Sequence, residues 1–109
     1  MIRDNVMSGN NLSGIAWTYE SVIQGNLIGT DASGMQPVPN YYGIDINGGW
    51  DNLIGGSSPG EGNLLSGNHF GLLIGNHSAS GNLVQGNRIG TDLSGTSIIS
   101  NVHRGIFIS

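Results

Sequence analysis

The sequence predicts an all-β protein in which short strands stack as the coils of a solenoid. Three observations carry this prediction: a composition rich in Gly, Asn, Ser and branched aliphatic residues, an apolar tetrad that recurs along the chain, and Asn residues at repeated places beside the apolar segments. The 109 residues are enough for one small domain, which we take as residues 1–109.

The composition argues against a helical bundle. Gly, Asn and Ser together supply 46 of the 109 residues, whereas Lys is absent and Ala occurs three times. The apolar residues are mainly Ile, Leu and Val, which suit a pleated surface better than a helix.

Charge, hydropathy and cysteine content exclude several classes of partner. Three Arg against seven acidic residues give a net charge of −4, so we expect no binding to the phosphate backbone of nucleic acid. No apolar run is long enough to span a membrane, and the N-terminus has no hydrophobic region of the signal-peptide kind. The absence of Cys excludes disulfides and thiolate metal sites.

The tetrad Gly-apolar-x-apolar marks the repeat. It occurs four times, at spacings of 29, 28 and 34 residues. The copies are Gly14-Ile15-Ala16-Trp17, Gly43-Ile44-Asp45-Ile46, Gly71-Leu72-Leu73-Ile74 and Gly105-Ile106-Phe107-Ile108. We therefore divide the chain into a partial coil at residues 1–13, coils at 14–42, 43–70 and 71–104, and the start of another coil at 105–109.

Two further apolar segments lie between successive tetrads, so each coil is predicted to contain three short strands. These segments are Val22–Gly25 with Leu27–Gly29, then Leu53–Gly55 with Leu64–Gly67, then Leu83–Gly86 with Arg88–Gly90. Residues 52–55 (NLIG) also align with residues 26–29 (NLIG), and both alignments leave three strands per coil. Parallel strands about 4.8 Å apart would make a stack of about four coils roughly 20 Å tall.

Within each tetrad we expect the two apolar flanks to point inward and the residue between them to point outward. The side chains predicted to be buried on successive coils are Ile44, Ile46, Leu72 and Ile74. The column predicted to face outward is Ala16, Asp45, Leu73 and Phe107.

The recurring Asn residues predict ladders at the bends between strands. Asn tolerates the backbone conformations of bends, and its side-chain amide can bond the Asn stacked one coil away. The residues in suitable places are Asn26, Asn68 and Asn87, which follow a Gly, and Asn52, Asn63 and Asn82, which precede a strand.

Long connections are expected to leave the solenoid at one corner. Residues 35–42 and 96–104 each follow a Gly-Thr-Asp-x-Ser-Gly phrase, and Pro37 and Pro39 suit a protruding loop better than a strand. We expect these connections to lie at the same corner, two coils apart. The coil between them carries its extra length at residues 55–62 instead.

Three phrases of the sequence resemble a known family. VIQGNLIGTDASG (residues 22–34), NLIGGSSPGEGNLLSGN (52–68) and NLVQGNRIGTDLSG (82–95) are similar to the repeats of the pectin-lyase-like superfamily, particularly the Asn- and Gly-rich arrays of large bacterial surface and secreted proteins. The resemblance implies a right-handed parallel β-helix and a location at the cell surface or outside the cell. The superfamily includes polysaccharide lyases, hydrolases and epimerases alongside adhesins and structural arrays, so the resemblance does not assign an activity.

Catalytic chemistry has few candidate residues. The resemblance implies that a lyase would carry clustered carboxylates for calcium and a basic residue, and a glycosidase needs two carboxyl groups roughly 5 to 10 Å apart. The outward column offers only Asp45. Tyr42-Gly43-Ile44-Asp45 resembles the Tyr-Gly-Phe-Asp-Pro-His motif of alginate epimerases, but Ile46 and Asn47 stand where that motif has Pro and His. We assign no catalytic residue.

Metal ligands are equally sparse, and we predict neither a metal site nor a cofactor. Asp31 and Asp92 lie in matching loops, where each could contribute to a calcium site or form a turn that accepts backbone N–H groups. His69, His77 and His103 lie on different bends and lack the spacing of a zinc site.

A glycan is the partner for which the sequence offers contact residues. Tyr41, Tyr42 and Trp50 could present flat rings to sugar faces beside Asp45, while the alternative is that these rings stack against their own coil. We therefore predict a non-catalytic structural, adhesive or glycan-contacting module. The alternative is a polysaccharide-active enzyme of lyase, hydrolase or epimerase type.

The ends of the solenoid predict a homo-oligomer. Terminal coils expose strand edges and open core, and this chain has no Lys to oppose pairing between edges. We expect end-to-end stacking with Ile106, Phe107 and Ile108 at the junction. The alternative is that residues 96–104 fold over the end as a cap.

Overall fold

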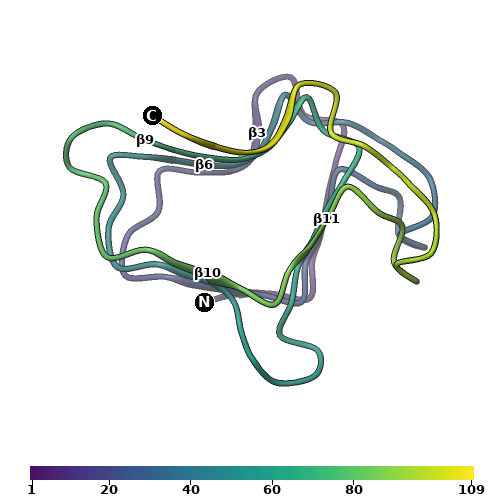
Figure 1. Cartoon of the computed structure of the whole chain (residues 1–109), viewed down its shortest axis with the longest axis horizontal. Coiled ribbons are helices and arrows are strands. Elements are labelled where there is room, and N and C mark those ends of the chain that lie inside the picture. Colours follow the sequence, from purple (N-terminus) through teal and green to yellow (C-terminus); the bar gives the residue numbers. More distant parts are fainter.

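Twelve short strands form three parallel sheets that enclose one core (Figure 1). The structure is a computed structural model that describes all 109 residues. Sheet A contains β1 (Ile2–Arg3), β4 (Val22–Gln24), β7 (Leu53–Gly55) and β10 (Leu83–Gln85). Sheet B contains β2 (Val6–Met7), β5 (Leu27–Ile28), β8 (Leu64–Leu65) and β11 (Arg88–Ile89). Sheet C contains β3 (Ser13–Ala16), β6 (Tyr42–Asn47), β9 (Phe70–Gly75) and β12 (Arg104–Ile108).

The chain visits the sheets in the order A, B, C four times, which makes four coils. We number them coil 1 (β1 to β3), coil 2 (β4 to β6), coil 3 (β7 to β9) and coil 4 (β10 to β12). In Figure 1 the path runs counterclockwise while it comes toward the viewer, so the helix is right-handed. The prediction of an all-β parallel helix with three strands per coil is confirmed. The molecule measures 35 × 29 × 18 Å, with the shortest dimension along the helix axis.

The strand register agrees with the repeats in the sequence. Val22 pairs with Leu53, which settles the ambiguous alignment in favour of sheet A. The predicted outward column is also in register, because Ala16 pairs with Asp45, Asp45 with Leu73, and Leu73 with Phe107.

The core is a single cluster of aliphatic side chains from all three sheets. Ile44, Ile46 and Leu72 are fully buried, as predicted. Ile74 is only half-buried, contrary to the prediction, because the residue paired with it in coil 4 is Ile108, which is itself 72% exposed.

The first tetrad departs from the pattern at Trp17. Strand β3 ends at Ala16, and Trp17 has a φ of 57°. The chain therefore turns away from the sheet before the fourth tetrad position, and Trp17 is 71% exposed instead of pointing inward. Positive φ is uncommon for a bulky residue, so the bend here overrides the repeat.

Asn ladders occupy all three corners, and all six predicted Asn residues belong to them. The ladder between sheets A and B is Asn5, Asn26, Asn63 and Asn87. The ladder between sheets B and C is Asn10, Asn40, Asn68 and Asn101. The ladder between sheets C and A is Ser21, Asn52 and Asn82.

These ladders satisfy polar groups that the corners bury. Asn26 and Asn68 are fully buried, yet each donates to and accepts from ladder neighbours and also donates to a strand carbonyl. Buried polar groups require such partners. The ladders thus allow the chain to turn at each corner without leaving these buried amides unpaired.

The two long connections leave the same corner, between sheets B and C, as predicted (Figure 1). Each folds back on itself as a small antiparallel pair, with Thr30 opposite Pro37 and Thr91 opposite Ile98. They also contact each other across coil 3, because the Leu93 N–H donates to the Gly34 carbonyl at 2.9 Å. The extra length of coil 3 projects from the corner between sheets A and B. The chain forms no helix, and hence none that could cross a membrane.

Candidate functional site

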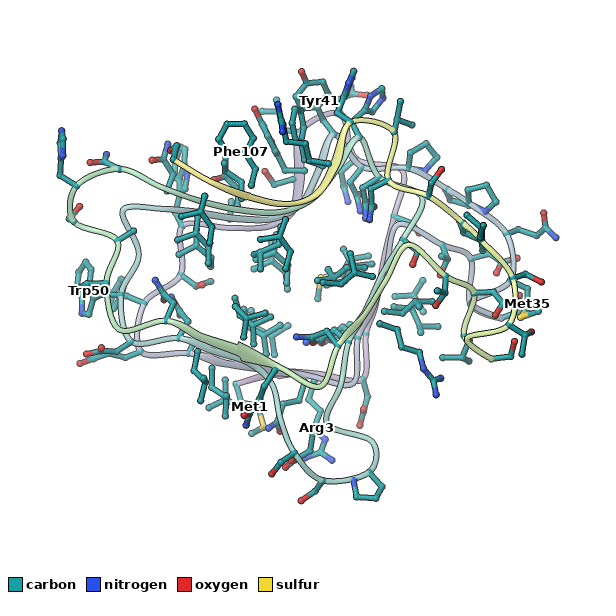
Figure 2. The ribbon with its side chains drawn as sticks, viewed as in Figure 1. Met1, Arg3, Met35, Tyr41, Trp50 and Phe107 are labelled. Carbon is teal, nitrogen blue, oxygen red and sulfur yellow. The ribbon has the colours of Figure 1, made fainter.

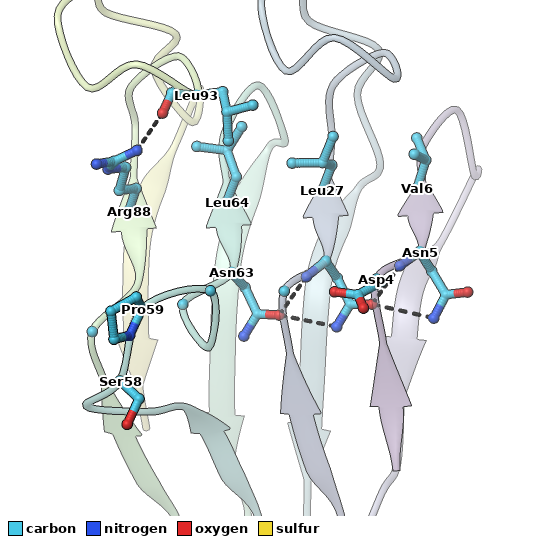
Figure 3. Close-up of a pocket in the computed structure, with 15 residues that line it drawn as sticks. Asp4, Asn5, Val6, Leu27, Ser58, Pro59, Asn63, Leu64, Arg88 and Leu93 are labelled. Atoms are coloured by element: carbon cyan, nitrogen blue, oxygen red, sulfur yellow. Dashed lines mark hydrogen bonds between the residues drawn. The ribbon is translucent and has the colours of Figure 1, made fainter.

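A groove runs over the outer face of sheet B (Figure 3). Its floor consists of outward side chains that lie side by side on successive coils: Val6, Leu27, Leu64 and Arg88. One wall is the coil 3 excursion with Ser58 and Pro59, and the other includes Leu93. The groove has a volume of about 580 Å³, which lies within the usual size range of small-molecule sites.

The groove is apolar in the middle and has a charged side chain at each end. Leu64 is only 2% exposed although it lies outside the core, and both Leu93 and Leu64 approach Gly34 closely. At the coil 4 end, the Arg88 guanidinium donates to the Leu93 carbonyl. At the coil 1 end, the Asp4 carboxylate lies against Gly25 and is paired with Arg3 at 3.5 Å.

Sequence reasoning missed this groove. The extra length at residues 55–62 was visible, and so was Arg88 at a position where the two preceding coils have Leu. Neither signal shows that the coil 3 excursion and the loop bearing Leu93 rise on opposite sides of the same strands.

Aromatic side chains form a strip on the outer side of the corner between sheets B and C. We call Tyr41, Tyr42, His69, Phe70, His103 and Phe107 the aromatic strip. Tyr41 stacks on His69 with ring centroids 5.1 Å apart, and His69 stacks on His103 at 5.5 Å. Tyr42 stacks on Phe70 at 5.3 Å.

The predicted glycan residues are therefore only partly brought together. Tyr41 and Tyr42 lie edge to face at 4.8 Å. Trp50 lies at a different corner, where it stacks on Tyr19 at 4.9 Å (Figure 2). These rings stack against other side chains of the protein, which is the alternative that the sequence left open. A stacked ring has one face fewer to offer a sugar.

Asp45 lies on the outer face of sheet C between apolar neighbours. It is 8% exposed, and its Oδ1 atom is buried without a hydrogen-bond partner. Burial raises the pKa of this carboxyl above its ordinary value. Its register partners are Ala16 and Leu73, so no second carboxylate lies directly beside it on either neighbouring strand.

The matching aspartates form turns of the Asx type, one of the two alternatives left open by the sequence. Oδ1 of Asp31 accepts from the Ser33 hydroxyl at 2.6 Å and from the Ser33 N–H at 3.1 Å. Oδ1 of Asp92 accepts from the Ser94 hydroxyl at 2.6 Å and from the Thr96 N–H at 3.3 Å. These bonds, the hydroxyl bond first, lower the pKa of both carboxyls below their ordinary value.

The histidines are arranged differently from the expectation. His69 and His103 occupy the same corner on adjacent coils and stack on each other, contrary to the expectation that they lie on different bends. Their separation of 34 residues is one turn of the helix including the long connection. No group of three His, Asp or Glu side chains is close enough to hold a metal ion.

Comparisons with known proteins found no family model, curated protein or solved structure that matches this chain. The resemblance to the pectin-lyase-like superfamily therefore has support from the fold alone. What the structure establishes is a right-handed β-solenoid of three parallel sheets.

Proposed function

We propose that the chain is a non-catalytic structural module whose groove over sheet B contacts an extended, uncharged polysaccharide. The observation that supports this proposal is the groove itself, with an apolar floor across three coils and polar groups at both ends. A sugar chain presents apolar C–H faces and hydroxyl edges, and such a floor and rim would accommodate both. The net charge of −4 disfavours an acidic polysaccharide.

The structural part of the proposal is supported by how the polar residues are used. The Asn residues of the corners bond one another, the loop aspartates bond their own turns, and the aromatic strip is stacked on itself. A scaffold whose polar side chains bond one another within its own coils is suited to presenting a surface.

Titration calorimetry with neutral β-glucan oligomers tests the groove. Leu27→Asn would place an amide in the middle of the floor, and we expect a loss of affinity of at least tenfold. Leu53→Asn is the matched control, because Leu53 is a half-buried leucine on the outer face of sheet A. Equal losses in both variants, or no binding by the unmodified chain, would reject the groove as the glycan site.

The same experiment covers the sequence-predicted contacts. Tyr41→Ala and Trp50→Ala test the two corners separately, and a loss confined to these variants would move the contact surface away from the groove.

Incubation with acidic polysaccharides, followed by absorbance of unsaturated uronates and a reducing-end assay, tests the alternative of a polysaccharide-active enzyme. The raised pKa of Asp45 is the one feature that favours an acid catalyst, and turnover abolished by Asp45→Asn would replace the structural proposal.

A further inference from the structure

The Asn ladders all have the same direction along the helix axis. In each step between two Asn residues, the backbone N–H and side-chain amide of one Asn donate to Oδ1 of the Asn in the following coil, and Ser21 donates to Asn52 through its backbone N–H alone. Asn5 donates to Asn26 in this way at 3.0 and 3.2 Å, and Asn26 to Asn63 at 3.0 and 2.9 Å. A ladder therefore has an acceptor end at coil 1 and a donor end at coil 4.

The coil 4 face presents the donors. The backbone N–H groups of Asn82, Asn87 and Asn101 bond no acceptor. Each of their side-chain amides donates once, to the carbonyls of Gly49, Ile54 and Leu65 respectively, which leaves one hydrogen of each amide free. Unpaired donors are costly unless water or a partner satisfies them.

The coil 1 face presents the matching acceptors. Oδ1 of Asn5 and Oδ1 of Asn10 accept no hydrogen bond, and both residues are exposed. These residues head the same two ladders that end at Asn87 and Asn101. At the third corner the position before β1 is Met1, whose side chain has no amide oxygen, so two of the three ladders find complementary groups on the opposite face.

The apolar surfaces of the two faces also match. The inward side chains Val84 and Ile89 of coil 4 and Ile2 and Met7 of coil 1 are only half-buried. Ile106 is 45% exposed, although its partner Leu72 and the next residue of that register column, Ile44, are fully buried. The core is thus open at both faces, and stacking would make it continuous.

The corner loops favour the same arrangement. Coils 1 and 3 have short connections between sheets B and C, and coils 2 and 4 have long ones, so a coil 1 placed after coil 4 continues the alternation. The contact between the Leu93 N–H and the Gly34 carbonyl also has a counterpart. Ala32, in the place of Leu93, has a free N–H, and Gly95, in the place of Gly34, has a free carbonyl.

We infer that the coil 4 face binds the coil 1 face of a second copy of this chain, head to tail and in register. The junction continues the Asn87 ladder into Asn5 and the Asn101 ladder into Asn10 of the next copy, and strand β12 pairs with β3 of that copy. Because the two surfaces differ, the contact repeats by translation and gives open-ended filaments instead of closed dimers. This inference goes beyond the proposed glycan contact and does not depend on it.

Variants that block one face at a time test the direction of stacking. Ile108→Lys puts a charge on the coil 4 face at an exposed position, and Asn5→Lys removes an acceptor and adds a charge on the coil 1 face. Leu73→Lys is the control, because Leu73 lies on the outer face of sheet C in an interior coil. Ile106→Lys replaces Ile108→Lys if the latter loses its β-type circular dichroism.

Sedimentation velocity over a hundredfold range of concentration supplies the readout. We expect the unmodified chain and Leu73→Lys to form species larger than dimers as concentration rises. Each face variant alone stays monomeric, with an apparent dissociation constant raised at least a hundredfold, and an equimolar mixture of the two forms a dimer and nothing larger. A monomeric unmodified chain at every concentration would overturn the inference. Dimers formed by either face variant alone would also overturn it, because they require pairing of like faces.

Discussion

Coils 2 and 4 begin with nearly the same 13 residues, which have different surroundings. Residues 22–34 read VIQGNLIGTDASG and residues 83–95 read LVQGNRIGTDLSG. Ile23, Asn26 and Ile28 in coil 2 are fully buried, whereas their counterparts Val84, Asn87 and Ile89 in coil 4 are half-buried. The local conformation is the same in both, with Gly25 and Gly86 at φ values of 66° and 69°.

The local conformation of a coil and the burial of its side chains therefore have different origins. The motif specifies the bends and strands of a coil, and the neighbouring coils supply the burial. Stability in such a stack is approximately a sum of terms for each coil and for each interface. Equivalent substitutions in coils 2 and 4 should therefore have unequal effects.

The largest difference is expected between Ile46→Asp and Ile108→Asp. The two isoleucines belong to one register column, but Ile46 is fully buried and Ile108 is 72% exposed. Ile46→Asp buries an unpaired charge and should unfold the chain, whereas Ile108→Asp should leave it folded. Circular dichroism and thermal melting measure both. A folded Ile46→Asp variant with an unchanged melting temperature would contradict the register described above.

A smaller difference is expected between Asn26→Ala and Asn87→Ala. Asn26 accepts from Asn5 and donates to Asn63 and to the Ile2 carbonyl, whereas Asn87 accepts from Asn63 and donates only to the Ile54 carbonyl. Each buried partner left unpaired costs roughly 1–3 kcal/mol. Urea unfolding should therefore show the larger loss for Asn26→Ala. Equal losses would mean that the ladders do not contribute more in the interior.

The smallest effect is expected from Asp31→Asn and Asp92→Asn. The pKa of each carboxyl is lowered, so its hydrogen bonds stabilise the folded state at neutral pH, and this contribution is lost as pH falls below 3.8 through the folded pKa. Each variant should melt slightly below the unmodified chain at pH 7, and the gap should close near pH 2. A gap that stays constant with pH would show that charge does not matter in these turns.

Much of the fold could be read from the sequence because the repeats are periodic. The tetrads predicted sheet C and its outward column, and the Asn spacing predicted the ladders. The outward position of Trp17 was not predicted, because a bend with positive φ follows Ala16. The stack of His69 on His103 and the groove beside Leu93 depend on how corner loops fold and on which coil lies next to which, and the residues themselves carry no periodic signal for either.

The ladders also bear on how the chain reaches this structure. In the ladder between sheets A and B, the Asn contacts join residues 21 to 37 positions apart in the sequence, so no ladder bond can form until a whole turn has closed. Closing a loop of that length costs entropy before any contact compensates for it. The first productive event is then the docking of two complete coils, and coils 2 and 3 together hold most of the fully buried isoleucines and leucines. Folding should spread outward from that pair, and coils 1 and 4 should be the last to form and the first to exchange their amide hydrogens with solvent.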